Sequence, residues 1–239
     1  MSGDSVFSVD AYLEMIDALM RCGYVVRDYF DVRPESQHLI VRHDIDMCLD
    51  SALRLARAER AHNIRATYFV LLRSELYNLL APPELDAVRE ICALGHGVGL
   101  HLDAAQYEQS IEALNAGAAH ECEMLEALLG QPVNLISLHR PAAALLGSEA
   151  TLGGRAHVYQ PRWFSAIGYC SDSRGRWGHG QPLEQEAVAA GRALQLLTHP
   201  IWWTGPVQGT PATILDTLVV GADERFRRVL ARECSAYQK

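Results

Sequence analysis

The residues best suited to chemistry form the run His43-Asp44-Ile45-Asp46, which follows the apolar run Leu39-Ile40-Val41. Residues i and i+2 of an extended strand point to the same face, so Asp44 and Asp46 would converge on one site at the strand's end while His43 turns away. One carboxylate can then bind a metal while the other acts as a base. The pattern fits a plain structural role equally well, in which the two aspartates cap the helix that follows.

Further along the chain, four more predicted strands end in polar groups of a similar kind. The five groups are His43-Asp44-Ile45-Asp46, His101-Leu102-Asp103, His139-Arg140-Pro141, Ser171-Asp172-Ser173-Arg174 and Thr198-His199-Pro200. In parallel α/β folds, ligands bind beyond the carboxyl ends of the strands, whether the sheet is open or closed. One such group is weak evidence, but five are hard to attribute to helix capping. An aspartate with two histidines fits a three-ligand zinc site that leaves one position for water.

Apolar periodicity predicts helices that alternate with strands along most of the chain. The helices cover residues 8–23, 49–63, 82–95 and 111–130, and a C-terminal helical region begins at Pro211 and is interrupted near Gly221. The strands cover residues 39–44, 65–72, 97–102, 133–138 and 194–197, and two more are expected at 158–164 and 166–170. This alternation indicates βαβ units and a parallel sheet, either open and doubly wound or closed into a barrel. No repeat or linker divides the chain, so residues 1–239 are expected to form one domain.

Composition and charge exclude several classes of function. The 239 residues carry a formal charge of −8 without a basic cluster, which argues against a nucleic-acid-binding surface. No segment reaches ~18 consecutive apolar residues, so no membrane span is expected. The six cysteines include no CxxC pair, and residues 1–7 lack the pattern of a secretory signal. We therefore expect a soluble, cytoplasmic protein with reduced thiols.

Five sequence motifs resemble those of a known family. They read RHDID at residues 42–46, GLHLDA at 99–104, SLHRP at 137–141, SDSRGRW at 171–177 and LLTHPIWW at 196–203. Their order and content resemble the polysaccharide deacetylase superfamily, the NodB-like carbohydrate esterases of family 4 type. The resemblance is closer to a divergent WbmS-like branch from bacterial surface-polysaccharide gene clusters, and it covers about residues 8–205. It implies an incomplete parallel (β/α)7 barrel.

The resemblance also implies a metal site. The family's first motif contains a metal-binding aspartate, which falls on Asp46. Its second motif supplies two metal-binding histidines four residues apart, of which the first matches His101 and the second falls on Ala105. We expect His139 to replace the missing ligand, with Asp103 as the competing candidate. The implied cofactor is one divalent metal ion, with zinc as the expected metal.

Acid, base and substrate-binding residues follow from the same motifs. The aspartate that acts as the family's base falls on Asp44, and the arginine that orients this base falls on Arg140. The histidine of the fifth motif, the general acid, falls on His199. The remaining matched positions are expected to contact substrate; they are Asp103, Asp172, Arg174, Trp177 and Trp202.

The function that this resemblance implies is metal-dependent removal of an N-acyl group, expected to be acetyl, from a sugar. Because no secretory signal is visible, the expected partner is a carbohydrate, nucleotide-sugar or lipid-linked precursor used in surface-polysaccharide synthesis. Two alternatives stay open at this point. The same site could act on a formyl group or another amide, or the chain could be a non-catalytic family member that binds a glycan, as the departure at Ala105 suggests.

Overall fold

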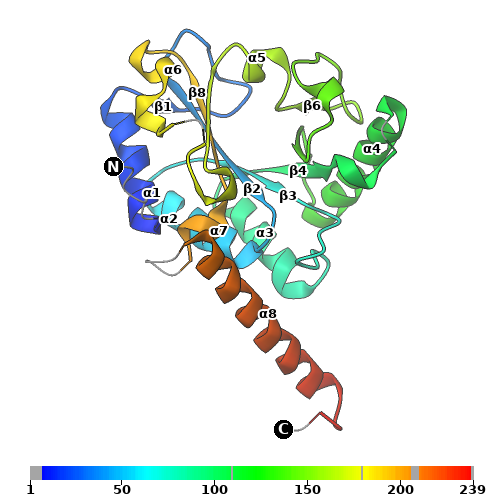
Figure 1. Cartoon of the computed structure of the whole chain (residues 1–239). Helices are drawn as coiled ribbons and strands as arrows, with labels where there is room; N and C mark the ends of the chain where they lie inside the picture. Colours follow the sequence, from blue (N-terminus) through cyan, green and yellow to red (C-terminus); the bar gives the residue numbers. More distant parts are fainter. Residues whose placement is uncertain (1–6, 109, 179, 206–209, 238–239) are drawn as a thin grey trace.

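The computed structural model describes residues 7–108, 110–178, 180–205 and 210–237. Its strands are β1 (Val25–Val26), β2 (His38–Ile45), β3 (Thr67–Val70), β4 (Gly97–Asp103), β5 (Leu135–His139), β6 (Ala156–His157), β7 (Gly168–Ser171) and β8 (Leu194–Thr198). They form one parallel sheet in the order β6-β5-β4-β3-β2-β8-β7, with β1 beside β2 (Figure 1). Within the described residues the end strands β6 and β7 do not pair, so the sheet curls without closing. The predicted incomplete parallel (β/α)7 barrel is confirmed.

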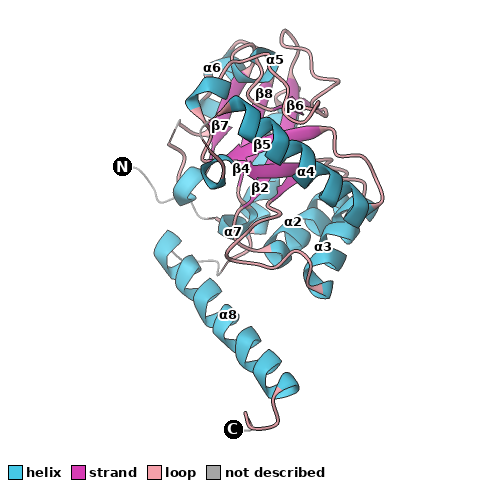
Figure 2. Ribbon diagram, turned by 90° about the vertical axis from the view of Figure 1, so that its right-hand side faces the viewer, coloured by secondary structure: helices cyan, strands magenta, loops and turns pink. Residues whose placement is uncertain are grey.

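Helices connect successive strands and cover the outside of the curled sheet (Figure 2). They are α1 (Val9–Arg21), α2 (Leu49–Ala61), α3 (Pro82–Ala93), α4 (Ile111–Leu129), α5 (Pro161–Phe164), α6 (Glu186–Ala189), α7 (Pro200–Trp203) and α8 (Pro211–Glu233). Four short 3-10 turns lie at Ala104–Gln106, Ala143–Leu145, Ser173–Gly175 and Pro182–Glu184. Helix α8 extends away from the barrel, and Ile214 is its buried residue. In the described part of the chain, no helix has the length and apolar character needed to cross a membrane.

Two local predictions were wrong, and one short strand was missed. The strand expected at residues 158–164 is replaced by α5, which begins at Pro161, because proline has no N–H to donate to a sheet and is well suited to the first turn of a helix. Gly221 does not interrupt α8, since a single glycine costs a helix only about 1 kcal/mol relative to alanine. The two-residue strand β1 was not predicted, because it is too short to show a pattern.

Strand β2 lies near the middle of the sheet and presents different chemistry on its two faces. Ile40, Arg42 and Asp44 alternate with Val41 and His43, as the two-residue period of a strand requires. Ile40 belongs to a small apolar cluster on one face of the sheet, and Val41 belongs to the large core between the sheet and the outer helices. Arg42 and Asp44 therefore share the face of Ile40, whereas His43 points toward the helices.

On the helix side of β2, His43 joins a buried network centred on Glu59 of α2. The His43 Nε2 atom lies 2.8 Å from Glu59 Oε1, and its Nδ1 atom lies 2.7 Å from the Thr198 hydroxyl. The Tyr12 and Tyr68 hydroxyls donate to the two carboxylate oxygens of Glu59, at 2.5 and 2.6 Å. Burial would raise the pKa of Glu59, but His43 and the other neighbours hold it below its ordinary value. The network thus ties α1 and α2 to β2, β3 and β8 through one buried carboxylate.

We expect Glu59→Gln to destabilise the fold by about 3 kcal/mol or more at neutral pH, because it removes the acceptor charge from a buried hydrogen-bonded group. The pKa of Glu59 is lowered in the folded protein, so its contribution is present above the ordinary value of 4.5 and is lost as the pH falls through the folded-state pKa. Urea unfolding of both proteins from pH 7 down to pH 4 measures this difference. An equal free energy of unfolding at pH 7 would contradict the prediction, and Arg57→Ala, in an exposed ion pair with Glu90, serves as the control.

Candidate active site

Asp46 lies at the centre of a group of histidines contributed by neighbouring strand ends. Its Oδ1 atom is 3.1 Å from His101 Nε2 and 3.3 Å from His139 Nδ1, and its Oδ2 atom is 3.7 Å from His199 Nε2. His101 belongs to β4, His139 ends β5 and His199 follows β8. The parallel sheet places all these strand ends at one edge, so residues far apart in the sequence surround one carboxylate.

Three members of this group are arranged to hold a metal ion. Donor atoms of Asp46, His101 and His139 all lie within 4.8 Å of one another. The 3.1 and 3.3 Å separations match the ~3.3 Å edge of a tetrahedron built with the ~2.0–2.1 Å bonds of zinc to nitrogen and oxygen. The other ring nitrogen of His101 lies 3.1 Å from the Ser137 hydroxyl, an interaction that fixes the orientation of the ring. One carboxylate and two imidazoles are a donor set that suits zinc.

The group contains His139, the preferred replacement for the ligand missing at Ala105. The competing candidate, Asp103, lies outside it and binds Arg140, whose Nε donates to Asp103 Oδ1 at 3.0 Å and whose Nη2 donates to Oδ2. The Asp103 carboxylate also accepts the backbone N–H of Ala105 at 3.2 Å and the side-chain amide of Gln106 at 3.1 Å. Asp103 therefore holds the loop after β4 in place.

The predicted contact between Arg140 and Asp44 is wrong, because a different arginine holds this aspartate. Arg42 donates to both carboxylate oxygens of Asp44, at 2.9 and 2.7 Å, and also to Gln195 Oε1 at 3.2 Å and to the Ser137 hydroxyl at 2.5 Å. The side chains of Arg42 and Asp44 are 2% and 5% exposed, whereas that of Arg140 is 58% exposed. The alternation that pairs Asp44 with Asp46 also places Arg42 on the same face, and this signal in the sequence was missed.

The ion pair sets the protonation state of Asp44. Burial would raise the pKa of its carboxyl group, but the Arg42 guanidinium, followed by His101, outweighs this effect and holds the pKa below its ordinary value. Burial also opposes the charge of Arg42, whose pKa the Asp44 carboxylate raises. Asp44 is therefore ionised at neutral pH, and its Oδ2 atom lies 3.8 Å from His101 Nε2.

Asp172 has a different environment from the predicted one. It was expected to line a substrate groove, but it is fully buried and accepts the backbone N–H of His199 at 3.1 Å and the indole N–H of Trp203 at 2.7 Å. Its Oδ1 atom lies 2.6 Å from His199 Nδ1. Burial would lower the pKa of His199, but the Asp172 carboxylate outweighs it and, with Asp46 and Asp44, raises that pKa to about 9. The prediction that Asp172 contacts substrate is therefore wrong.

The aromatic and basic residues predicted to contact substrate differ in exposure. Trp202 is 4% exposed within the core, so it offers no ring face to a sugar, and that prediction is wrong. Trp177 is partly buried and stacks on Phe7, whereas Arg174 is exposed, so substrate contact by Trp177 and Arg174 stays a prediction. Arg174 adopts the left-handed conformation, with φ of 63°, as does Arg140 with φ of 54°. Non-glycine residues of this kind are uncommon and gather at functional sites; Arg140 directly follows β5, and Arg174 lies in the 3-10 turn after β7.

Comparisons with known proteins give similarities of fold at low sequence identity. No family model matches the chain, and no curated protein matches it. Similar solved structures include a CE4 family pseudoenzyme from Bacillus anthracis, with 15% identity and a TM-score of 0.45 over 81% of this chain. The chain spans 63% of the length of that structure. A polysaccharide deacetylase from Bacillus cereus has 16% identity and a TM-score of 0.45, with 81% of this chain and 89% of that chain covered. A family 4 carbohydrate esterase from Bacillus anthracis has 12% identity and a TM-score of 0.43, with 89% of this chain and 85% of that chain covered.

These structures are of the kind that the sequence motifs predicted. At such identities and TM-scores they do not assign the chain to a family, so its function has to be argued from the residues of the site.

Metal analysis of protein purified without chelators should find about one divalent ion per chain. Asp46→Ala, His101→Ala and His139→Ala should each lower this occupancy strongly, because each removes one of three donors. Asp103→Ala is the matched control, since its carboxylate binds Arg140 and should leave the metal content unchanged. Full occupancy in His139→Ala together with loss in Asp103→Ala would reverse the assignment of the third ligand.

Proposed function

We propose that the protein is a metal-dependent hydrolase that removes an N-acyl group, in the first instance acetyl, from a sugar. The observation that carries this proposal is the placement of an ionised carboxylate and a protonatable imidazole around the Asp46, His101 and His139 cluster. Asp44 approaches the cluster at His101, with 3.8 Å between Oδ2 and Nε2, and His199 approaches it at Asp46, with 3.7 Å between Nε2 and Oδ2. Amide hydrolysis needs a base for water and an acid for the departing amine.

The residues of the cluster would hold the metal. A divalent ion bound by Asp46, His101 and His139 would supply a Lewis acid that polarises the acyl carbonyl. It would also lower the pKa of water, so that hydroxide is available for attack at neutral pH. Ser137 keeps the His101 ring oriented through its hydroxyl, and the same hydroxyl accepts a hydrogen bond from Arg42. The metal-binding group and the proposed base are therefore held by one shared side chain.

Asp44 serves as the base in this proposal. It is ionised, because the Arg42 guanidinium holds its pKa low, and it would accept one proton from water as the water oxygen attacks the acyl carbon. Both carboxylate oxygens of Asp44 bind Arg42, so the orientation of the carboxylate is fixed before substrate arrives. A base of fixed orientation needs no rearrangement during proton transfer.

His199 serves as the acid. Asp172 lies against its Nδ1 atom, so Nδ1 carries a proton that faces Asp172, and the Nε2 atom faces the cluster. The raised pKa keeps His199 protonated at neutral pH, and its Nε2 proton would pass to the nitrogen of the sugar as the C–N bond breaks. The products are a carboxylate, which is acetate for an acetyl group, and a free amino sugar.

The substrate and its place in the cell complete the proposal. The resemblance of the motifs to proteins of surface-polysaccharide gene clusters supports a nucleotide-sugar or lipid-linked precursor, handled in the cytoplasm. A catalytic role, as opposed to a non-catalytic one, is supported by His139, which places a third donor beside Asp46 and His101. A binding protein also has no need for a buried base and a histidine held by a buried carboxylate.

Asp44→Asn should lower acetate release from a panel of N-acetylated nucleotide sugars by about 10²–10⁴-fold while retaining the bound metal. The amide keeps the shape of the side chain but cannot accept the proton of water. Enzymatic acetate assays, paired with metal analysis of the same samples, measure both quantities, and Asp86→Asn on the exposed surface of α3 is the control. Normal turnover in Asp44→Asn would remove Asp44 as the base, and no release by the unaltered protein across the panel would contradict the proposed activity.

Asp172→Asn should move the alkaline limb of the pH profile of kcat/KM to lower pH. The Asp172 carboxylate raises the pKa of His199, so removing its charge lowers that pKa, and the acid form of His199 is lost at a lower pH. Trp203→Phe is the matched control, because it removes a hydrogen bond to Asp172 and keeps the carboxylate charge. An alkaline limb that stays in place in Asp172→Asn, or that moves equally in both variants, would contradict the role of Asp172.

A further inference from the structure

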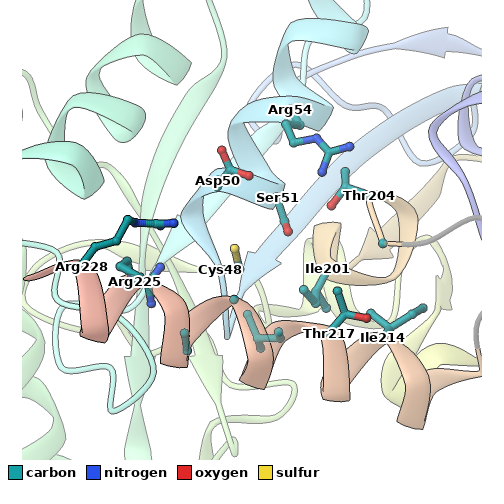
Figure 3. A pocket seen from close by; sticks show the side chains of 14 residues that line it. Cys48, Asp50, Ser51, Arg54, Ile201, Thr204, Ile214, Thr217, Arg225 and Arg228 are labelled. Carbon is teal, nitrogen blue, oxygen red and sulfur yellow. The ribbon is translucent and has the colours of Figure 1, made fainter. Parts of the chain in front are cut away.

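A pocket of about 510 Å³ lies between the start of α2, helix α7 and one face of α8 (Figure 3). Cys48, in its wall, comes two residues after Asp46 in the sequence, and Ile201 comes two residues after His199. The pocket is thus built from the segments that directly follow two residues of the candidate active site. None of the residues that line it takes part in the chemistry proposed above.

The lining of this pocket is cationic in a chain that is acidic as a whole. Arg54, Arg225 and Arg228 contribute three guanidinium groups, and Asp50 contributes the one carboxylate found in the lining among described residues. Arg225 pairs with Glu84, with 3.7 Å between Nη1 and Oε1. Arg54 and Arg228 form no ion pair within the part of the chain that the structure describes. With a formal charge of −8 on the whole protein, unpaired arginines gathered at one pocket indicate an anionic ligand.

A serine hydroxyl without a protein partner lies in the same pocket. Ser51 is 7% exposed, and its hydroxyl makes no hydrogen bond within the described chain. Figure 3 shows this hydroxyl directed from α2 into the pocket, beside Cys48 and Ile201. A hydroxyl that faces a pocket and has no protein partner can donate a hydrogen bond to a ligand atom or accept one from it.

The start of α2 adds backbone donors to the hydroxyl. Cys48 is the residue that precedes this 13-residue helix, and its side chain makes no hydrogen bond to the first turn. Among the described residues, no side chain is seen to accept a hydrogen bond from the N–H groups of that turn, which carry the positive end of the helix dipole and have the Asp50 carboxylate in the same turn. Backbone N–H groups, a serine hydroxyl and arginines together form the donor set that proteins use for phosphate.

We propose that this pocket binds a phosphate-bearing group. Its volume exceeds that of a bare phosphate and lies in the range of ligand sites of about 300–1,000 Å³, so it has room for the group that carries the phosphate. The phosphate could belong to the substrate itself or to a separate phosphate-containing anion. The first source rests on the proposed function, because it makes the pocket the anchor for a phosphorylated precursor whose acyl group reaches Asp44 and His199. The second source is independent of it.

Binding is tested first with inorganic phosphate, by titration calorimetry at constant ionic strength. We expect the double variant Arg54→Ala/Arg228→Ala to weaken phosphate binding at least about tenfold, and Ser51→Ala to weaken it to a smaller degree. The control variant Arg57→Ala/Arg227→Ala removes two exposed arginines from the same two helices, both of which pair with acidic residues outside the pocket. It should bind phosphate as the unaltered protein does. Equal binding by all these proteins, or binding of acetate as strong as that of phosphate, would overturn the proposal.

Kinetics then separate the two sources. If the substrate supplies the phosphate, Arg54→Ala/Arg228→Ala should raise KM at least about tenfold for an N-acetylated nucleotide sugar and leave KM unchanged for the same sugar without phosphate. Equal KM values in the two proteins, together with weakened phosphate binding, would assign the pocket to a separate anion. Absence of hydrolysis by the unaltered protein would count against the proposed function, while the calorimetric result would still decide whether the pocket binds phosphate.

Discussion

The structure depends on an ion pair buried on the inner face of the barrel, between Arg42 and Asp44. Removing both charges from water costs free energy, and the pair is tolerated because Arg42 makes two parallel hydrogen bonds to the carboxylate and finds further acceptors in Gln195 and Ser137. Gln195 belongs to β8 and Ser137 belongs to β5, and these two strands lie on opposite sides of β2 in the strand order of the sheet. The sheet must therefore curl enough to bring β5 and β8 to the same guanidinium. The charge that fixes the proposed base also constrains the curvature of the barrel.

Strand β2 performs a second task on its opposite face. His43 lies between Arg42 and Asp44 in the sequence and contacts Glu59 and Thr198 on the side of the helices. Thr198 directly precedes His199, and Asp172 holds His199 from β7's end. Asp44 and His199 thus each adjoin a residue of the buried network around Glu59, namely His43 and Thr198. The period of two residues separates reactive groups on one face from their supports on the other.

The sequence was sufficient to predict the parallel barrel and the residues that gather at its edge, for reasons of local pattern. Apolar strands such as 39–44 and 97–102 end in polar groups, and parallel strands bring such ends together regardless of their separation in the chain. Partners of individual side chains could not be predicted in this way. Arg140 matches a family motif, but its side chain faces solvent and Asp103, whereas Arg42 acts from within the strand. Likewise, nothing in the pattern of residues 171–177 distinguishes an exposed Asp172 from one that is fully buried under Trp203.

The proposed role of His139 as the third metal ligand has a geometric reason in the register of β4 and β5. His101 lies opposite Ser137 and Asp103 lies opposite His139, so His139 is two residues further along the same face, one step nearer the open edge. His139 reaches the Asp46 carboxylate from the end of β5, with 3.3 Å between Nδ1 and Oδ1. Asp46, His101 and His139 consequently follow or belong to three different strands, β2, β4 and β5. Strand ends hold donor atoms more rigidly than a loop does, so the sheet itself would maintain the geometry of the proposed metal site.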